Sequence, residues 1–130
     1  MSLSTNLLDA LSPENRIFVA FSGGLDSTAL LFLCNKALKE KKIRNLKAIH
    51  INHNLSKNSD NWQQHCESFC RSNNIEFESF MVKVSKNRSS IESQARQARY
   101  KIFESLLDEN DQILLAHHRD DVFETILLRL

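Results

Sequence analysis

The chain's only two glycines, Gly23 and Gly24, lie side by side in the stretch SGGLDST, residues 22–28. An apolar run, RIFVAF, precedes them at residues 16–21, and a helical pattern follows from Asp26. Two glycines permit positive φ angles and remove side chains, so that backbone N–H groups can close around an anion. The following helix adds its positive end, and Ser22, Ser27 and Thr28 add hydroxyl groups. This pattern predicts a phosphate-binding loop.

The loop differs from two common phosphate-binding motifs. It contains no lysine and no GK[ST], as a Walker loop would, and it lacks the GxGxxG of dinucleotide-binding folds. Asp26 lies where a phosphate would approach, which suits either a bridging Mg²⁺ or another ligand group facing the carboxylate. The alternative is a tight turn between a strand and a helix, with an aspartate that favours the helix N-terminus.

A second polar group lies in the stretch AHHRDDVFET, residues 116–125. On a helix from residue 120 onward, one polar stripe would carry four side chains spaced i, i+3, i+4 and i+7: His117, Asp120, Asp121 and Glu124. One imidazole and three carboxylates can bind Mg²⁺ or an amine. The alternative is that the carboxylates only favour a helix N-terminus.

Arginines and histidines supply further candidates. In IESQARQARY, residues 91–100, Arg96 and Arg99 suit bidentate contact with a phosphate or a cytosine edge. The alternative is a solvated face in which Glu92 pairs with Arg96. His50 and His53 end a predicted strand, where an imidazole can also simply hydrogen-bond to the backbone.

Three cysteines, an odd number without a CxxC pair, favour free thiols in a reducing compartment. Cys66 and Cys70 lie on the apolar face of a predicted helix, and a metal site there lacks a fourth ligand. We therefore expect Cys66 and Cys70 to lie in the core.

Apolar runs and amphipathic stretches alternate along the chain. Strands are predicted at residues 16–21, 46–52, 76–84 and 112–116, and helices at 26–39, 60–72, 91–107 and from 120 onward. This alternation predicts an α/β fold, a doubly wound and mostly parallel sheet with helices on both faces. Ligands bind such sheets beyond the carboxyl ends of the strands, where the candidate residues fall.

Bulk properties fit one globular domain. The chain has 130 residues, 42% of them hydrophobic and 25% charged, and a net charge of +1. So small a charge creates no global field that would attract nucleic acid or a membrane. Neither a signal peptide nor an apolar stretch of membrane-spanning length is present in the sequence, which favours a cytoplasmic location.

SGGLDST matches the SGGxDS motif of the PP-loop ATP pyrophosphatases, which split ATP between its α and β phosphates. The resemblance implies a Rossmann-like fold and an ATP site at Ser22, Gly23, Gly24, Leu25, Asp26 and Ser27. Three further segments, HINHNLSKNSD, IESQARQARY and AHHRDDVFET, follow in order. Together with the loop they closely resemble the N-terminal catalytic domain of tRNA(Ile)-lysidine synthetases, over nearly all of residues 16–130.

That resemblance implies an ATP-dependent ligase. It would adenylate the wobble cytidine of tRNA(Ile) with a CAU anticodon and then join free L-lysine to it, with ATP and Mg²⁺ required. The implied roles are catalysis by Asp26, Arg96, His117, Asp121 and Glu124; lysine binding by Asp26, Asp121 and Glu124; and a tentative Mg²⁺ ligand at Asp26. Base or ribose contacts fall to Ile49, Asn52 and His53, and contacts to tRNA or phosphate fall to Arg96 and Arg99. No membrane partner is expected, and homodimer formation stays open.

The predicted organisation is an N-terminal helix and lead-in over residues 1–15 and a catalytic core over 16–130. We expect the core to be cut before its end and the C-terminal tRNA-binding domains to be absent. Asn54 and Val122 depart from the family pattern, which has glycine and glutamine there. Two alternatives remain: another PP-loop enzyme, such as a tRNA thiolase or an amidotransferase synthetase, or a non-catalytic module that binds adenine nucleotides.

Overall fold

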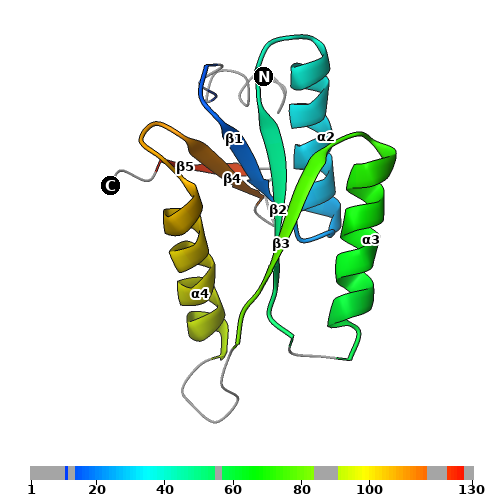
Figure 1. The fold of residues 1–130 in the computed structure, drawn as a ribbon, viewed down its shortest axis with the longest axis vertical. Coiled ribbons are helices and arrows are strands. Elements are labelled where there is room, and N and C mark those ends of the chain that lie inside the picture. The colour runs from blue at the N-terminus through cyan, green and yellow to red at the C-terminus, as the bar shows by residue number, and fades with distance from the viewer. Residues whose placement is uncertain (1–10, 12–13, 55–56, 84–90, 117–122, 128–130) are drawn as a thin grey trace.

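The computed structural model of the chain describes residues 11, 14–54, 57–83, 91–116 and 123–127. Strands and helices alternate along most of this length (Figure 1). In chain order the elements are β1 (Ile17–Ala20), α2 (Leu25–Lys39), β2 (Leu46–Asn52), α3 (Ser59–Ser72), β3 (Glu76–Met81), α4 (Ile91–Leu106), β4 (Gln112–Ala116) and β5 (Phe123–Leu127).

The strands form one sheet in the order β3-β2-β1-β4-β5. The first four strands in this order run parallel, with Ile17 of β1 in register with Leu46 of β2 on one side and with Gln112 of β4 on the other. β5 pairs with β4 in the antiparallel sense. The chain winds outward from β1 to β3 and then crosses back to β4, which makes the carboxyl ends of β1 and β4 a topological switch point.

Helices cover both faces of the sheet, as Figure 1 shows, with α2 and α3 on one side and α4 on the other. Alternate residues of β1 face opposite layers because side chains in a strand alternate between its two faces. Val19 packs into the core under α2 and α3, and Phe18 packs into the core under α4. The predicted doubly wound α/β fold is therefore confirmed.

An ion pair between distant segments closes the amino-terminal edge of the sheet. The Arg16 guanidinium contacts the buried Asp111 carboxylate twice, with Nε and Nη2 at 2.9 and 2.6 Å from Oδ2. Nη2 also reaches the exposed Asp108 carboxylate at 2.9 Å and the carbonyl of Leu106 at 3.2 Å. The start of β1 is thus fixed to the turn that leads from α4 into β4.

Predicted and observed elements agree over most of the chain. The strands at residues 46–52 and 112–116 have the predicted bounds, and α2, α3 and α4 differ from prediction by one residue at an end. The strand predicted at residues 76–84 ends at Met81. The predicted N-terminal helix lies outside the described residues, except for residues 11, 14 and 15.

The helix predicted from residue 120 onward is wrong over residues 123–127, which form β5. Charge spacing and a short apolar run supported that helix, but a short apolar run suits a strand equally well. Phe123, Thr125 and Ile126 favour extended backbone, and the edge of β4 offers the pairing partner. Residues 117–122 lie outside the described residues. In the described part of the chain, no helix has the length and apolar character needed to cross a membrane.

Candidate functional site

The glycine loop, residues 22–27, joins the carboxyl end of β1 to α2. Hydrogen bonds within the loop shape it: the Ser22 and Ser27 hydroxyl oxygens are 2.9 Å apart, and the Gly24 N–H donates to Ser22 Oγ at 3.3 Å. The hydroxyl groups of Ser27 and Thr28 donate to the Gly24 carbonyl at 3.2 and 2.7 Å. The hydroxyls of Ser27 and Thr28, expected as ligand donors, therefore support the loop from within.

The two glycines meet different requirements. Gly23 has a φ of +86°, and a Cβ added there would lie 2.7 Å from Cys66 Sγ and 3.1 Å from the Trp62 ring. Gly24 has an ordinary φ of −73°, and an added Cβ would meet only Ser22 Oγ at 3.5 Å. Gly23 is thus required by the fold of this chain itself. Nothing in the described residues requires glycine at residue 24, where the missing side chain leaves room for a ligand to approach the backbone closely.

The N-terminus of α2 is open to a ligand. Gly24 is the N-cap, and no side chain caps the helix. The first N–H groups of a helix have no partner within it, and the helix dipole adds positive potential there. Asp26, the one acidic residue in this first turn, is half-buried. An anion held at the backbone and a cation held by Asp26 would fit here together.

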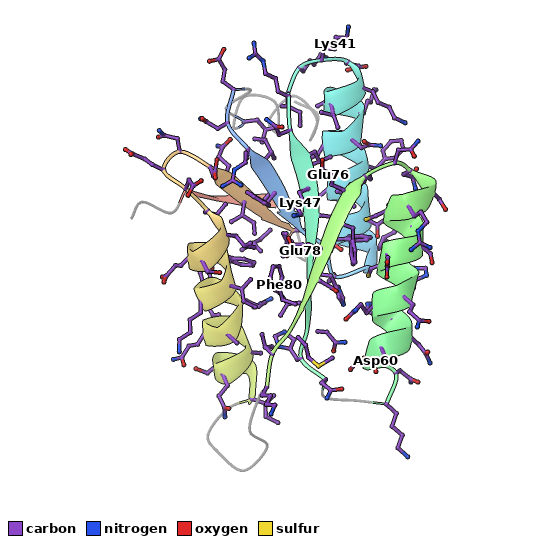
Figure 2. All side chains as sticks on the ribbon, viewed as in Figure 1. Lys41, Lys47, Asp60, Glu76, Glu78 and Phe80 are labelled. Atoms are coloured by element: carbon purple, nitrogen blue, oxygen red, sulfur yellow. The ribbon has the colours of Figure 1, made fainter. Side chains whose placement is uncertain are left out.

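A cleft of about 590 Å³ lies beside the glycine loop at the carboxyl edge of the sheet. Its walls come from the glycine loop, the end of β2, the first turn of α3, the middle of α4, and the end of β4. Figure 2 labels Asp60 at this edge, at the start of α3, and Lys41 at the opposite edge. The volume lies in the range of small-molecule and cofactor sites.

The end of β2 supplies one wall of the cleft. Ile49 is buried in the core under α4 and lines the cleft, and its contact with the base or ribose stays a prediction. The buried His50 ring donates from Nδ1 to the Phe21 carbonyl at 2.9 Å and stacks on Phe77. His50 therefore has the backbone-binding role that the sequence left as an alternative.

Asn52 lines the cleft but uses its side chain within the protein. Its amide nitrogen donates to Asp60 Oδ1 at 3.1 Å and to Gln63 Oε1 at 2.9 Å, and its oxygen accepts from the Asn54 N–H at 2.8 Å. These bonds fix the turn between β2 and α3. Asn54 adopts a φ of +53°, a left-handed conformation that asparagine tolerates well.

Arg96, Arg99 and Tyr100 of α4 line the opposite wall. The exposed Arg96 guanidinium lies over the Tyr100 ring, 5.2 Å from its centroid. The side chain of Glu92, its alternative partner, lies outside the described residues.

Two buried polar atoms of this cleft have no hydrogen-bond partner within the described part of the chain: Arg99 Nε and His53 Nδ1. Burial lowers the pKa of His53 below its ordinary value, and the positive charge of Arg99 and the nearby His50 lower it further. The His53 ring is therefore neutral at pH 7. Buried polar atoms without partners beside a permanent positive charge are typical of a site that a ligand completes.

The predicted acidic stripe is described only in part. His117, Asp120 and Asp121 lie outside the described residues, and Glu124 lies in β5, in register with Leu115 of β4. Leu115 itself lines the cleft. The backbone of Glu124 thus lies on the strand that pairs with the cleft-lining end of β4. The lysine-binding roles of Asp26, Asp121 and Glu124 stay a prediction.

All three cysteines are free, as predicted, and all three are fully buried, which confirms the core position predicted for Cys66 and Cys70. Burial raises the pKa of Cys66 to about 11 and those of Cys34 and Cys70 to about 12, which makes the thiols unreactive. Within the described ranges, no group of three or more histidine, cysteine, aspartate or glutamate side chains could hold a metal ion.

Sequence reasoning missed two aromatic residues of the cleft. The helical spacing of Trp62 with Cys66 and Cys70 predicts the apolar face of α3, but Trp62 is 46% exposed, lines the cleft, and donates from Nε1 to the Ser22 carbonyl. Tyr100 lies within the IESQARQARY motif and packs against Phe103 with centroids 5.7 Å apart. A tryptophan with a polar edge in an otherwise apolar helical stripe was the available signal for Trp62.

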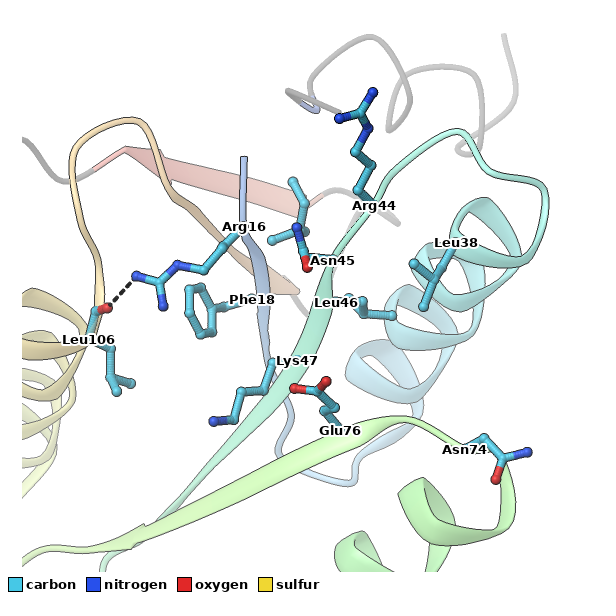
Figure 3. Close-up of a pocket in the computed structure, with 11 residues that line it drawn as sticks. Arg16, Phe18, Leu38, Arg44, Asn45, Leu46, Lys47, Asn74, Glu76 and Leu106 are labelled. Carbon is cyan, nitrogen blue, oxygen red and sulfur yellow. Dashed lines mark hydrogen bonds between the residues drawn. The ribbon is translucent and has the colours of Figure 1, made fainter. Parts of the chain in front are cut away.

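A smaller hollow of about 290 Å³ lies at the opposite, amino-terminal edge of the sheet (Figure 3). Its basic lining residues include Arg16 and Lys47, which pair with Asp111 and Glu78 respectively, and the exposed Arg44. Two of its three cations are thus already neutralised. The open helix terminus, the two unpartnered buried polar atoms and the larger cleft all lie at the other edge.

A glycine loop between the first strand of a parallel β3-β2-β1-β4 array and an open helix N-terminus defines a nucleotide-binding α/β domain. The family model for the PP-loop domain matches residues 2–130, and the chain belongs to this family.

Among curated proteins, the chain is similar to tRNA(Ile)-lysidine synthases. The chain is 44% identical over 131 aligned residues to the tRNA(Ile)-lysidine synthase of Pseudomonas syringae pv. tomato, covering 98% of this chain and 29% of that protein. It is 43% identical to the enzyme of Legionella pneumophila strain Lens, with the same coverage of both proteins. The chain therefore spans about 29% of the length of these relatives.

Solved structures also resemble the fold, as one example shows. The U34-tRNA thiolase NcsA from Methanococcus maripaludis superposes with a TM-score of 0.66 at 22% identity, covering 80% of this chain and 39% of that one. At this identity the likeness supports the fold alone.

Proposed function

We propose that this chain forms the ATP-binding and adenylating part of a tRNA(Ile)-lysidine synthase. The observation that carries the proposal is the glycine loop with its open helix terminus, facing the arginines of α4 across one cleft. Identity of 39–44% to lysidine synthases over nearly the whole chain supports this enzyme over other PP-loop proteins.

The triphosphate of ATP fits the glycine loop. Gly24 allows close approach, and the first N–H groups of α2 offer donors to phosphate oxygens. Asp26 is the carboxylate at this place in the described chain, and Mg²⁺ is usually held by one or two carboxylates together with substrate phosphates. Asp26 would hold the ion, which would neutralise phosphate charge.

Arg99 and Arg96 would bind the phosphates or the target nucleotide. The orphaned Nε of Arg99 gains a partner when an oxygen acceptor enters the cleft. Arg96, planar and exposed over Tyr100, offers a fork of donors that matches a phosphate or a cytosine edge. The adenosine would lie along the end of β2, against Ile49 and the backbone around Asn52 and His53.

The proposed reaction has two balanced steps. In the first, O2 of the wobble cytidine attacks the α-phosphorus of ATP, and the bond to the β-phosphate breaks to release pyrophosphate. In the second, the ε-amine of lysine attacks C2 of the activated base, AMP leaves, and the amine loses a proton. Fixed N–H groups and arginines would stabilise the charge that develops on the phosphates.

Lysine binding needs acidic groups near the activated base. Asp26 lines the cleft, and the proposal adds Glu124, whose backbone lies one strand from Leu115 of the cleft. Asp121 and His117, outside the described residues, complete the proposed set. A carboxylate pocket first attracts the lysine cation, and His117 or a carboxylate would accept its proton.

The test is ATP-dependent pyrophosphate release with tRNA bearing a CAU anticodon, with lysine, and with both. Release with tRNA alone is expected, because the nucleotide is the activated group. Release with lysine alone would instead identify an amino-acid-activating ligase and overturn the proposal.

Since the chain spans under a third of its relatives' length, ATP binding is measured in parallel by calorimetry. Arg99→Gln should lower ATP affinity about 10-fold or more, the effect of losing one charged hydrogen bond to phosphate. Arg71→Gln, on an exposed arginine of α3 paired with Glu67, is the matched control and should leave affinity unchanged. No ATP binding by the unmodified chain would contradict the proposal.

A further inference from the structure

Side chains from outside the glycine loop hold two successive backbone carbonyls at its start. The Phe21 carbonyl accepts from His50 Nδ1 at 2.9 Å, and the Ser22 carbonyl accepts from the Trp62 indole Nε1. His50 lies on β2 and Trp62 on α3, so neither bond is local in sequence. Hydrogen bonds from β2 and α3 therefore fix the orientation of both carbonyls.

The geometry of a trans peptide then fixes the direction of the N–H that follows each carbonyl. In a planar trans peptide the C=O and the next N–H point in opposite directions, and no cis bond occurs in the described chain. Because the Ser22 carbonyl points to Trp62 on α3, the Gly23 N–H points away from α3. The neighbouring peptide follows this rule: its carbonyl meets His50, and its Ser22 N–H reaches Ser27 Oγ at 3.2 Å.

The local backbone does little to hold the Ser22–Gly23 peptide in this orientation. Gly23 occupies a φ of +86°, and glycine visits positive and negative φ with similar ease. What holds the peptide is α3: the Trp62 N–H binds the carbonyl, and the Trp62 ring and Cys66 Sγ fill the space behind the Gly23 Cα. A change at Trp62 would free this peptide to rotate without disturbing the hydrophobic cores.

We propose that Trp62 is a positioning residue of the phosphate site, whose indole N–H fixes the Ser22–Gly23 peptide so that the Gly23 N–H is presented to a phosphate oxygen. This inference rests on the proposed function, in which the glycine loop binds the triphosphate. Trp62 contacts the loop backbone and acts on the ligand only through it. The phosphate site would thus depend on the docking of α3 as well as on its own sequence.

The test is Trp62→Phe, which keeps an aromatic ring behind Gly23 and removes only the N–H donor. Dissociation constants for ATP and for pyrophosphate are measured by calorimetry, and thermal unfolding is followed on the same samples. We expect affinity for both ligands to fall about fivefold, the scale of one neutral hydrogen bond, with little change in melting temperature. His65→Ala is the matched control, because the His65 ring stacks on Trp62 with centroids 5.0 Å apart and makes no hydrogen bond to the described glycine loop, and it should leave affinity unchanged.

A spectroscopic readout separates positioning from general packing. The chain contains one tryptophan and two glycines, so the indole N–H and the two glycine amides are easily assigned in a ¹⁵N-labelled sample. In the unmodified protein, pyrophosphate should shift the Gly23 amide, and the indole N–H should exchange slowly with solvent. In Trp62→Phe the Gly23 shift on adding pyrophosphate should shrink or vanish.

The outcomes distinguish the two proposals. If the unmodified chain binds neither ATP nor pyrophosphate, the proposed function fails and this inference fails with it. If the unmodified chain and Trp62→Phe bind equally well, or if His65→Ala weakens binding as much, only the inference on Trp62 is overturned. Should Trp62→Phe fail to fold, a rapidly exchanging indole N–H or an unresponsive Gly23 amide in the unmodified protein would still overturn it.

Discussion

Two single substitutions, Gly23→Ala and Gly24→Ala, would show which glycine of the loop is needed for stability and which for ligand binding. The two residues are adjacent and receive the same added methyl group. Their surroundings differ: an added Cβ at residue 23 would lie 2.7 Å from Cys66 Sγ, whereas one at residue 24 would meet only Ser22 Oγ at 3.5 Å. We expect the first substitution to affect stability and the second to affect binding.

The cost at Gly23 has two parts. A non-glycine residue in left-handed conformation costs about 1–2 kcal/mol, and overpacking against a buried sulfur and an indole ring adds about 1–3 kcal/mol. A total near 3 kcal/mol is a large share of the 5–15 kcal/mol that is typical of a domain. For a chain of this size the melting temperature should fall by about 10 °C.

At Gly24 the effects on stability nearly cancel. Alanine is a poorer N-cap than glycine by about 0.5–1 kcal/mol, and it restricts the unfolded chain by about 0.4–1 kcal/mol. The melting temperature should therefore change by no more than about 2 °C. The methyl group would, however, stand at the open end of α2, and ATP affinity should fall at least about 10-fold.

Thermal unfolding by circular dichroism and ATP binding by calorimetry, on both variants and the unmodified chain, make the comparison. An unchanged melting temperature for Gly23→Ala would refute the argument from φ and packing. Full ATP affinity in Gly24→Ala would refute the claim that a ligand approaches the backbone there.

Three further predictions concern the fold and its titratable groups. Asp111→Ala should lower the free energy of unfolding by about 2 kcal/mol in urea titrations, because the buried Asp111 carboxylate accepts hydrogen bonds from the Arg16 side chain and from the Arg16 and Asp108 N–H groups, whereas Asp108→Ala at the exposed end should cost under about 0.5 kcal/mol. Equal effects would contradict this account of the ion pair. Because the pKa of His53 is lower in the folded chain, the unfolded chain binds more protons just below pH 6.5, and stability should decline as pH falls through this window. In His53→Gln the melting temperature should change less between pH 5 and 7 than in the unmodified chain. An unchanged pH dependence would mean that another group causes it. The three cysteine thiols, with pKa values raised to about 11 or 12, should resist alkylation at pH 8 until urea unfolds the chain, and rapid labelling of the native protein would contradict their burial.

Much of the fold could be predicted because β1, β2 and β4 are mostly buried strands. The run LKAIHIN of β2 and the run QILLA of β4 are short, apolar and flanked by polar residues, so their bounds could be read directly. β5 could not be predicted in this way. Its pairing with β4 depends on a tertiary edge, while the spacing of its apolar residues suits a helix as well.

The candidate site, too, could be predicted from the sequence only in part. The glycine loop could be predicted because glycine is so rare in this chain that a pair of them stands out. The bond from Trp62 to Ser22 joins residues 40 positions apart, and no local spacing signals it. Likewise, Asn52 and His50 were candidates for ligand contact, and only the structure reveals that the fold already uses their polar atoms.

The central place of β1 in the sheet has a consequence for synthesis of the protein. β1 leaves the ribosome first, yet its neighbour β4 follows 95 residues later, counted from Ile17 to its register partner Gln112. At typical elongation rates this interval lasts about 5–20 s, during which one edge of β1 has no strand to pair with. Contacts so distant in sequence form slowly, and α4, which carries Arg96 and Arg99, emerges only shortly before β4. A nascent chain can therefore form the complete cleft only after β4 has been translated. Only from then on could a bound nucleotide stabilise it.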